Sequence, residues 1–240
     1  MQPITTKKFL QKIKKNLNNT LSDTNRLFND IIKFNCLSHP PYRINDTRLT
    51  EYLNLNKQSP TFEKNILLYI CDWYESLKTK ISLLNYEINE TKTETGIVYC
   101  EQFYIEPCNE LIKLFNILLL YLQIQIFENN KLDEIELDLS YGLFKVNLTK
   151  AFNLLQSKNA DYASDNDPFK NFRLVEILGV DLKTGIFVRL CDKLSRVHNL
   201  LNNEAQVKDE SIQDTCLDAI NYCAILLTYI QIEIKNVTTK

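Results

Sequence analysis

The sequence predicts an all-α fold, and three observations lead to this prediction. Glycine is scarce, with 4 residues in a chain of 240, which disfavours turn-rich β folds and glycine-rich phosphate loops. Apolar residues make up 45% of the chain and recur at helical spacing. One example is the stripe formed by Leu190, Leu194, Val197 and Leu201. We therefore expect the chain to fold as a bundle of helices.

The expected helices follow one another along the chain. They cover residues 5–34, with a break near 22–23 where an N-cap pattern occurs, and then 47–56, 60–89, 107–128, 139–157, 182–201 and 208–235. Pro107 suits the first turn of its helix, because the N–H that proline lacks is unpaired there anyway. Loops are expected at 38–45, 91–96 and 159–171, the last being rich in Asp, Asn and Pro.

Charge and composition exclude several classes of protein. A formal net charge of −2 gives no electrostatic argument for binding nucleic acid or an anionic membrane. The longest apolar run, residues 114–127, is too short and too polar to span a bilayer, so it predicts a buried helix. The seven cysteines include no CxxC pair, which is typical of reduced thiols in a protein core. This predicts a cytoplasmic protein, which would lie in the host cytoplasm if the chain is viral. Only two histidines are present, which disfavours a zinc site.

The chain carries an apparent internal repeat. Residues 107–129 align without gaps with 215–237, and nine positions are identical. Upstream, residues 69–77 resemble 189–197. The alignment places Asp72, Glu106 and Glu110 opposite Asp192, Asp214 and Asp218. Chance similarity between two helices rich in Leu and Ile is the alternative. A duplication would make the chain a pseudo-dimer with an N-terminal half (1–135) and a C-terminal half (136–240).

Two stripes of charge mark the C-terminal half. At 3.6 residues per turn, Arg189, Asp192, Lys193 and Arg196 share one face of the first helix. The second helix is otherwise apolar, and its stripe consists of Glu210, Asp214, Asp218 and Tyr222. Buried carboxylates are costly unless a cation compensates them. That cation is either a divalent metal or the neighbouring Arg/Lys stripe. In the first half, Tyr69, Trp73 and Ser76 replace the basic residues, so whether that half keeps a site stays open.

Three blocks of this half resemble a phage and bacterial family, the first type of nucleotide-modification-associated domain. The blocks are KNADYASDNDPFKNF (158–172), GIFVRLCDKLSRVHNLL (185–201) and VKDESIQDTCLDAINYCAIL (207–226). They match a K-x-x-D-Y-G loop, an R-x-x-D-K-x-x-R helix and a D-E-S-x-x-D-T-x-x-D-x-x-x-Y helix, with Ala163 in place of the usual glycine. The resemblance implies a role in the nucleotide metabolism of viruses that modify their DNA.

The last block is also similar to the MazG-like all-α nucleotide pyrophosphatases, which hold Mg²⁺ between an E-x-x-E helix and an E-x-x-D helix. This similarity implies a MazG-like bundle, with a homo-oligomer as one option. Asp218 and the residues after it suit the second element. No E-x-x-E occurs on 182–201, and Thr215 occupies the usual Glu position, so the relation is distant.

These residues suggest Mg²⁺-dependent pyrophosphohydrolysis of a (deoxy)nucleoside triphosphate to monophosphate and pyrophosphate. Carboxylates are the ligands that Mg²⁺, or Mn²⁺ in its place, prefers. The expected metal ligands and catalytic residues are Asp192, Glu210, Asp214 and Asp218. The expected substrate-binding residues are Lys158, Asp161, Tyr162, Arg189, Lys193, Arg196 and Tyr222, with Phe169 and Phe172 as candidates for stacking on the base.

Each assignment has a structural alternative. The stripes could form an internal ion-pair network, with Arg189 and Arg196 against Asp214 and Asp218, that only fixes helix register. Asp165, Asn166 and Asp167 suit turns and caps better than a metal site, and the two phenylalanines could anchor the loop in the core. Two further functions therefore stay open: a non-catalytic protein that senses or sequesters a nucleotide, and a structural module that binds protein partners.

Overall fold

The computed structural model describes residues 4–34, 66–67, 69–79, 94–127, 137–164, 167–203 and 211–238. Its helices are α1 (Thr6–Phe34), α4 (Glu94–Phe127), α5 (Leu137–Tyr162), α6 (Leu182–Asn202) and α7 (Ile212–Thr238), with a short 3₁₀ helix, η2 (Arg173–Leu178), before α6. Residues 69–79 are also helical, and the described ranges contain no strand. The predicted all-α fold is confirmed.

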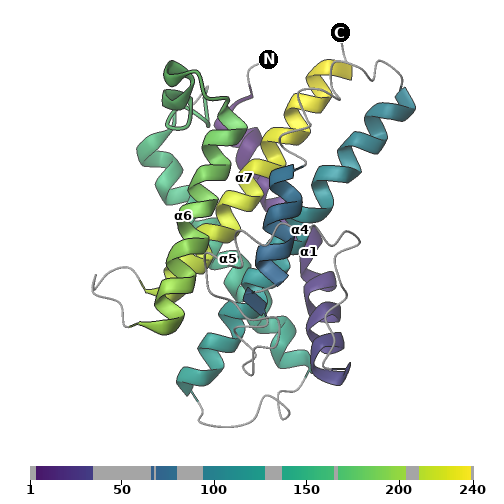
Figure 1. The fold of residues 1–240 in the computed structure, drawn as a ribbon, viewed down its shortest axis with the longest axis vertical. Coiled ribbons are helices and arrows are strands. Elements are labelled where there is room, and N and C mark those ends of the chain that lie inside the picture. Colours follow the sequence, from purple (N-terminus) through teal and green to yellow (C-terminus); the bar gives the residue numbers. More distant parts are fainter. Residues whose placement is uncertain are drawn as a thin grey trace.

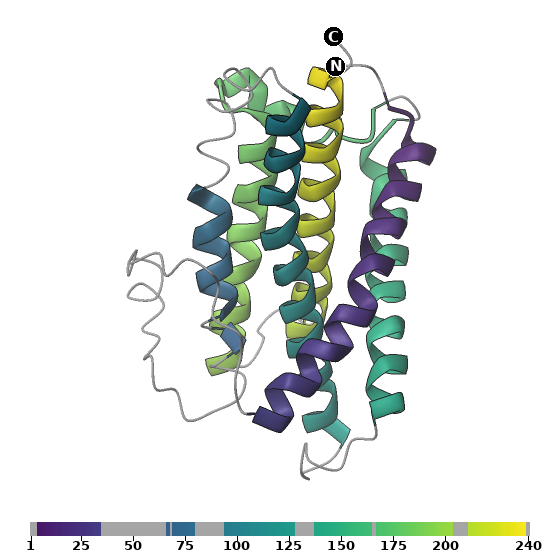
Figure 2. The same cartoon turned by 90° about the vertical axis from the view of Figure 1, so that its right-hand side faces the viewer.

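The helices form three layers with roughly parallel axes (Figures 1 and 2). Figure 2 shows α4 and α7 side by side in the middle, α1 and α5 on one side, and α6 on the other. The contacts between elements agree, because α7 packs against α4, α6 and α5, while α1 packs against α5 and α4. The helix at 69–79 joins the layer of α6, where Tyr74 stacks on Phe187 with ring centroids 4.5 Å apart.

The two central helices form the hydrophobic core. Every residue from Leu111 to Tyr121 is buried, as is every residue from Ala219 to Ile230 except the half-buried Tyr222. This confirms a buried helix for the part of the predicted run 114–127 whose side chains are described. Ile212–Asn236 of α7 is long and apolar enough to cross a membrane, but 78% of that window is buried in the bundle. A core helix has this composition too, so a cytoplasmic location stays a prediction.

Several predicted boundaries are wrong. α1 runs unbroken through residues 22–23, where Asp23 forms an ion pair with Arg26. α4 begins at Glu94, so residues 94–96 are helical and Pro107 lies inside a helix, where a proline removes one backbone donor and its ring crowds the carbonyl four residues earlier. α5 continues to Tyr162 rather than ending at 157. The predicted helix 47–56 lies outside the described residues, as do the ends of the predicted helix 60–89.

The contacts of the two central helices can be compared across the predicted duplication, which stays a prediction. The repeat equates α4 with α7. α4 packs against α1 of its own half and against α5 of the other half, and α7 packs against α5 of its own half and against α1 of the other half. The equivalent glutamines both bond to the other half, Gln123 as the donor and Gln231 as the acceptor. Gln123 bonds to Asn147 of α5 at 3.0 Å, and Gln231 bonds to Asn16 of α1 at 3.2 Å. One continuous core thus contains apolar residues of both halves.

Candidate functional site

A pocket of about 390 Å³ lies between α5, α6 and α7, within the roughly 300–1,000 Å³ range of small-ligand sites. It is lined by Phe9, Leu155, Lys158, Asn159, Tyr162, Pro168, Asn171, Phe172, Arg189, Lys193, Asp218, Asn221, Tyr222 and Ile225. All but Phe9 belong to the C-terminal half. Six of the predicted site residues therefore share one pocket: Lys158, Tyr162, Arg189, Lys193, Asp218 and Tyr222.

Asp218 is held between two lysines. Its Oδ1 lies 2.6 Å from Lys158 Nζ on α5, and its Oδ2 lies 3.0 Å from Lys193 Nζ on α6. The carboxylate side chain is 13% exposed and that of Lys193 is 24% exposed, whereas Lys158 is more open to solvent. Both carboxylate oxygens therefore have cationic partners, which satisfies the need of a half-buried acid for compensation.

The pocket has an excess of positive charge. Arg189 adds a third cation to the two lysines, and Asp218 is the only acid among the lining residues. Among the lining residues the difference is two positive charges, and the ion pair of Arg189 with Asp192, which lies outside the lining, offsets part of it. Arginine and lysine are the usual partners of phosphate oxygens, and their hydrogen bonds to anions are strong.

Aromatic rings cover the wall formed by the loop after α5. Phe172 packs edge-on against Tyr222 with ring centroids 6.2 Å apart, and both line the pocket. Tyr162 is 60% exposed at the mouth. Burial, and then the neighbouring Asp218 carboxylate, raise the pKa of Tyr222 above its ordinary value, so its hydroxyl stays a donor at neutral pH. Phe169 is instead a core residue, 4.9 Å from the ring of Phe9 and 5.3 Å from that of Tyr229, as the structural alternative predicted.

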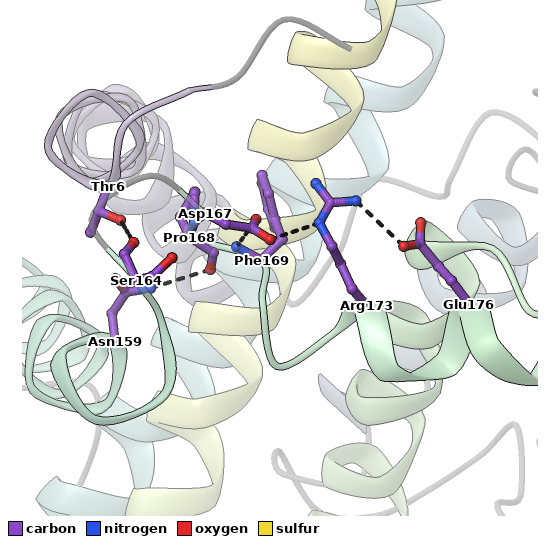
Figure 3. Close-up of polar contacts among 8 residues, drawn as sticks. All are labelled: Thr6, Asn159, Ser164, Asp167, Pro168, Phe169, Arg173 and Glu176. Carbon is purple, nitrogen blue, oxygen red and sulfur yellow. Dashed lines mark hydrogen bonds and ion pairs between the residues drawn. The ribbon is translucent and has the colours of Figure 1, made fainter.

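Hydrogen bonds fix the loop that forms this wall (Figure 3). Asp167 accepts a bond from the backbone N–H of Phe169 at 3.1 Å and one from Arg173 Nε at 2.8 Å. Thr6 of α1 donates to the carbonyl of Ser164 at 2.6 Å. Asp167 thus has the turn-stabilising role predicted for it, and Asp165 and Asn166 lie outside the described residues. The loop holds Pro168 and Phe172 against the pocket.

Two asparagines of the wall each have one engaged and one unengaged amide atom. Asn221 Nδ2 donates to the carbonyl of Ala151 at 2.8 Å, and Asn159 Nδ2 contacts the carbonyl of Pro168 at 3.5 Å. The Oδ1 atoms of both residues are buried and have no hydrogen-bond partner among the described residues. The sequence offered a signal for Asn221 that was overlooked, because this polar residue lies beside Asp218 and Tyr222 on a largely apolar helix.

Asp214 has a structural role. Its Oδ2 accepts bonds from the N–H of Ser211 at 3.1 Å and from the Ser211 hydroxyl at 2.6 Å, while Ser211 Oγ accepts from the N–H of Asp214 at 3.1 Å. These reciprocal bonds form a capping box, which explains why α7 begins at Ile212 rather than at Lys208. Glu210 precedes this helix start and lies outside the described residues.

The remaining predicted residues lie at or beyond the rim of the pocket. Asp192 is 61% exposed, and its carboxylate is 3.8 Å from the guanidinium of Arg189 on the same helix. Arg196 and Asp161 are not among the lining residues. Asp218 forms its ion pairs with Lys158 and Lys193 rather than with Arg189, and Asp214 bonds to Ser211. α5 continues to Tyr162, and this extra turn places Lys158 within reach of Asp218.

The equivalent positions of the first half are filled differently. Trp73, the counterpart of Lys193, is buried in the core, and Glu110, the counterpart of Asp218, forms an ion pair with Lys113 of its own helix. Burial raises the pKa of Glu110, and the pairing with Lys113 offsets part of that effect. Asp72 and Glu106 are exposed. Among the described residues, only the second half has an acid that is contacted by lysines from two other helices.

The described residues do not suit a resident divalent metal. They contain no group of three or more His, Cys, Asp or Glu side chains that could hold one. Asp218 is engaged by two lysines, Asp214 caps its helix, and Asp192 points to solvent beside Arg189. A cation placed at Asp218 would have to displace Lys158 and Lys193.

Comparison of this chain with family models, with curated proteins and with solved structures found no match. The resemblance to nucleotide-modification-associated and MazG-like proteins therefore stays a prediction based on the three sequence blocks. The interpretation of the pocket depends on its own chemistry.

Proposed function

We propose that this chain is a nucleotide-binding protein that holds its ligand between α5, α6 and α7 without a metal ion. The observation that supports this most directly is the group of Lys158, Arg189 and Lys193 around a single carboxylate, Asp218, in one pocket. Of the functions considered from the sequence, it corresponds to the nucleotide sensor or sequestering protein.

The charge of the pocket suits a phosphate monoester. Such a group carries about −1.5 to −2 at neutral pH, close to the excess of two positive charges contributed by the lining residues. The Asp218 carboxylate holds the two ammonium groups in place before the ligand arrives, so less side-chain freedom is lost on binding.

The aromatic lining residues suit a base. Phe172, Tyr222 and Tyr162 offer aromatic surface, with Ile225 and Pro168 beside them. Flat heteroaromatic rings bind such surfaces by stacking and edge contacts. A ligand with a phosphate at one end and a base at the other would use both walls of the pocket.

Mg²⁺-dependent pyrophosphohydrolysis is the second candidate. One observation favours it: Asp218, one of the predicted metal ligands, lines the same pocket as Arg189 and Lys193, two of the predicted substrate-binding cations. The lysines that occupy the oxygens of Asp218 argue against it. The two proposals differ in their need for a metal and in whether the nucleotide is consumed.

A thermal-shift panel of nucleoside mono- and triphosphates, in EDTA and in Mg²⁺, separates them. A ligand that binds only the folded state raises the melting temperature, so we expect stabilisation in EDTA and intact nucleotide by chromatography afterwards. Stabilisation only in Mg²⁺, with monophosphate and pyrophosphate as products, would establish the hydrolase instead. No shift with any nucleotide would contradict both and leave the third possibility, a module for protein partners.

A further inference from the structure

The outer layer formed by α1 and α5 has an uneven distribution of charge. Residues 4–22, which include most of α1, and residues 140–160 of α5 contain eight lysines and no acid. Acidic residues make up 30 of the 240 in the chain, one in eight, so about five would be expected among these 40 positions. The net charge of −2 therefore hides a local excess of positive charge.

Two hydrogen bonds show that these segments lie side by side and run antiparallel. Thr6, at the start of α1, donates to the carbonyl of Ser164, just after the end of α5. Ser140, near the start of α5, donates to Asn25, further along α1. Figure 2 shows both helices on the same side of the molecule. The lysines of the two helices therefore belong to one layer.

Six lysines of this layer are exposed, and we call them the basic face: Lys7, Lys8, Lys14, Lys15, Lys145 and Lys150. None of them forms an ion pair with an acid of the described residues. Lys14 lies at the seam between the helices, with its ammonium 5.7 Å from the centre of the Phe152 ring. The acids that follow along these helices, Asp23 and Asp161, lie at opposite ends of the face, and Asp23 is paired with Arg26.

The acids of the other layers compensate this charge only weakly. α6 lies in the layer farthest from α1 and α5 (Figure 2), and helices in contact pack about 8–10 Å apart. Asp181 and Asp192 are therefore roughly 16–20 Å from the basic face, about twice the Debye length at physiological ionic strength. On the central helices, Glu110 and Asp218 are paired with lysines outside the basic face.

The shape and charge of the basic face suit a ligand with many regularly spaced phosphates. Lysine binds phosphate as a point charge, and a nucleic-acid duplex carries one negative charge per roughly 1.7 Å of its axis. Because Lys14 lies opposite Phe152 on an antiparallel helix, the face extends about 20 Å from Lys145 to the level of Lys7 at 1.5 Å per residue. About six base pairs of a duplex have this length.

The side chains between the lysines favour a duplex over a membrane or a single strand. The exposed ones are mostly polar and uncharged, of the kinds that bond to phosphate and sugar: Gln11, Asn18, Asn19, Thr149, Asn153 and Gln156. Membrane-surface helices instead present large apolar side chains, and proteins that bind single strands stack bases on aromatic rings. Within 4–22 and 140–160, the large exposed apolar side chains are Tyr141 and Val146, both near one end of the face.

We propose that the basic face binds double-stranded nucleic acid through its phosphate backbone, without reading the base sequence. DNA and RNA duplexes share this chemistry. None of the six lysines lines the pocket between α5, α6 and α7. The inference therefore goes beyond the proposed function and does not depend on it.

The test is fluorescence anisotropy of the full chain in EDTA with a labelled duplex longer than the face, made once as DNA and once as RNA. We expect both to bind, and the affinity to fall by about 100-fold or more between about 50 and 200 mM salt, as about five phosphate contacts predict. A single strand of the same length and vesicles containing phosphatidylserine are the competing ligands. Tighter binding of either one, or no binding of the duplexes, would overturn the inference.

The triple variant Lys7→Gln/Lys14→Gln/Lys145→Gln tests the face itself. We expect its affinity for the duplex to fall about tenfold or more, with a salt dependence weaker by about three phosphate contacts. Glutamine is a good helix former, so the helices should be retained.

The matched control is Lys78→Gln/Lys170→Gln/Lys235→Gln. These lysines are also exposed, but they lie outside α1 and α5, and their loss changes the net charge by the same amount. We expect this variant to bind the duplex nearly as tightly as the wild type. Equal losses in the two triple variants would show that net charge rather than the basic face governs binding, and would overturn the inference.

Discussion

At the scale of single residues, the site depends on which cation meets Asp218. The sequence indicated that this acid needed compensation, and it placed Lys193 on a facing stripe. It did not indicate Lys158 as a partner of Asp218. That lysine lies 60 positions from Asp218 in the sequence, and its helix was expected to end one residue before it. The alternative that Arg189 would pair with Asp218 was wrong for a related reason, since helical spacing gives the face of a helix but not the depth at which each side chain sits.

Asp218→Asn distinguishes an electrostatic clamp from a metal ligand. Removing the carboxylate leaves three cations without an internal counter-charge, so we expect the affinity for a nucleoside monophosphate in EDTA to rise several-fold. The partners are partly exposed, so the free energy of unfolding should fall by no more than about 1 kcal/mol. Calorimetry and denaturant titration measure the two quantities. A metal ligand would instead show its loss of binding only when Mg²⁺ is present, and a loss of binding in EDTA would contradict the expected rise.

Glu233 on α7 provides a test of pH dependence. Burial raises its pKa above the ordinary value of 4.5, and the nearby Lys183 offsets only part of that effect. The folded state therefore holds the proton more tightly than the unfolded state, and stability declines as pH rises from about 4.5 through the higher folded pKa. We expect Glu233→Gln to remove this decline, so that the variant gains stability relative to the wild type between pH 4 and pH 7.

Asp181 is the control of opposite sign. Burial raises its pKa, but hydrogen bonds from Thr184 and the charge of Lys183 outweigh this effect and hold the pKa below its ordinary value of 3.8. Its contribution is therefore present at neutral pH and lost as pH falls through the lowered pKa. Urea unfolding across the pH range measures both slopes for the wild type and for Asp181→Asn. A Glu233→Gln variant with the wild-type slope would show that Glu233 is not the group responsible.

At the scale of elements, most helices were predictable and several helix ends were not. The 3.6-residue pattern placed both ends of α6 to within one residue. An apolar stripe runs along this helix, and the N-cap residue Asp181 marks its start. The start of α7 was misplaced because the carboxylate of Asp214 was assigned to a metal rather than to the capping box with Ser211. A motif of the type S-x-x-D before an apolar run has that local explanation.

Asp214→Ala tests this explanation. Loss of the capping box should lower the free energy of unfolding by about 1 kcal/mol while nucleotide affinity stays within error of the wild type. Ser211→Ala, which removes the reciprocal partner, should do the same. Chemical denaturation and calorimetry check both variants, and a loss of nucleotide binding in Asp214→Ala alone would restore this residue to the site.

The packing of η2 on α6 was not predictable from periodicity, because it depends on one close approach. A methyl group added at Gly185 would lie 2.6 Å from Val175 Cγ2, whereas one added at Gly142 of α5 would meet nothing within 4 Å. We expect Gly142→Ala to stabilise the protein by about 0.5–1 kcal/mol through helix propensity. Gly185→Ala should lose that gain or destabilise by about 1–3 kcal/mol through overpacking. Equal thermal shifts for the two variants would contradict the close approach.

At the scale of the whole molecule, the two helices that the sequence repeat equates, α4 and α7, pack against each other at the centre of one core, an arrangement that the repeat itself did not predict. Its equivalent glutamines, Gln123 and Gln231, make bonds to opposite outer helices. What the repeat could not give is the difference between the halves. That difference follows from side-chain volume and charge at equivalent positions, with Trp73 filling the core where Lys193 reaches the pocket.

The measurement that tests the central claim most directly is calorimetric titration of a ribonucleoside monophosphate, in EDTA, into the wild type and into the double variant Lys158→Met/Lys193→Met. The matched control is Lys145→Met/Lys150→Met, which removes two exposed lysines of α5 outside the pocket. Two charge-assisted hydrogen bonds predict a loss of about 100-fold or more in the first double variant and no change in the control. Equal affinity in all three proteins, or binding only after Mg²⁺ is added, would contradict a metal-free cationic nucleotide pocket.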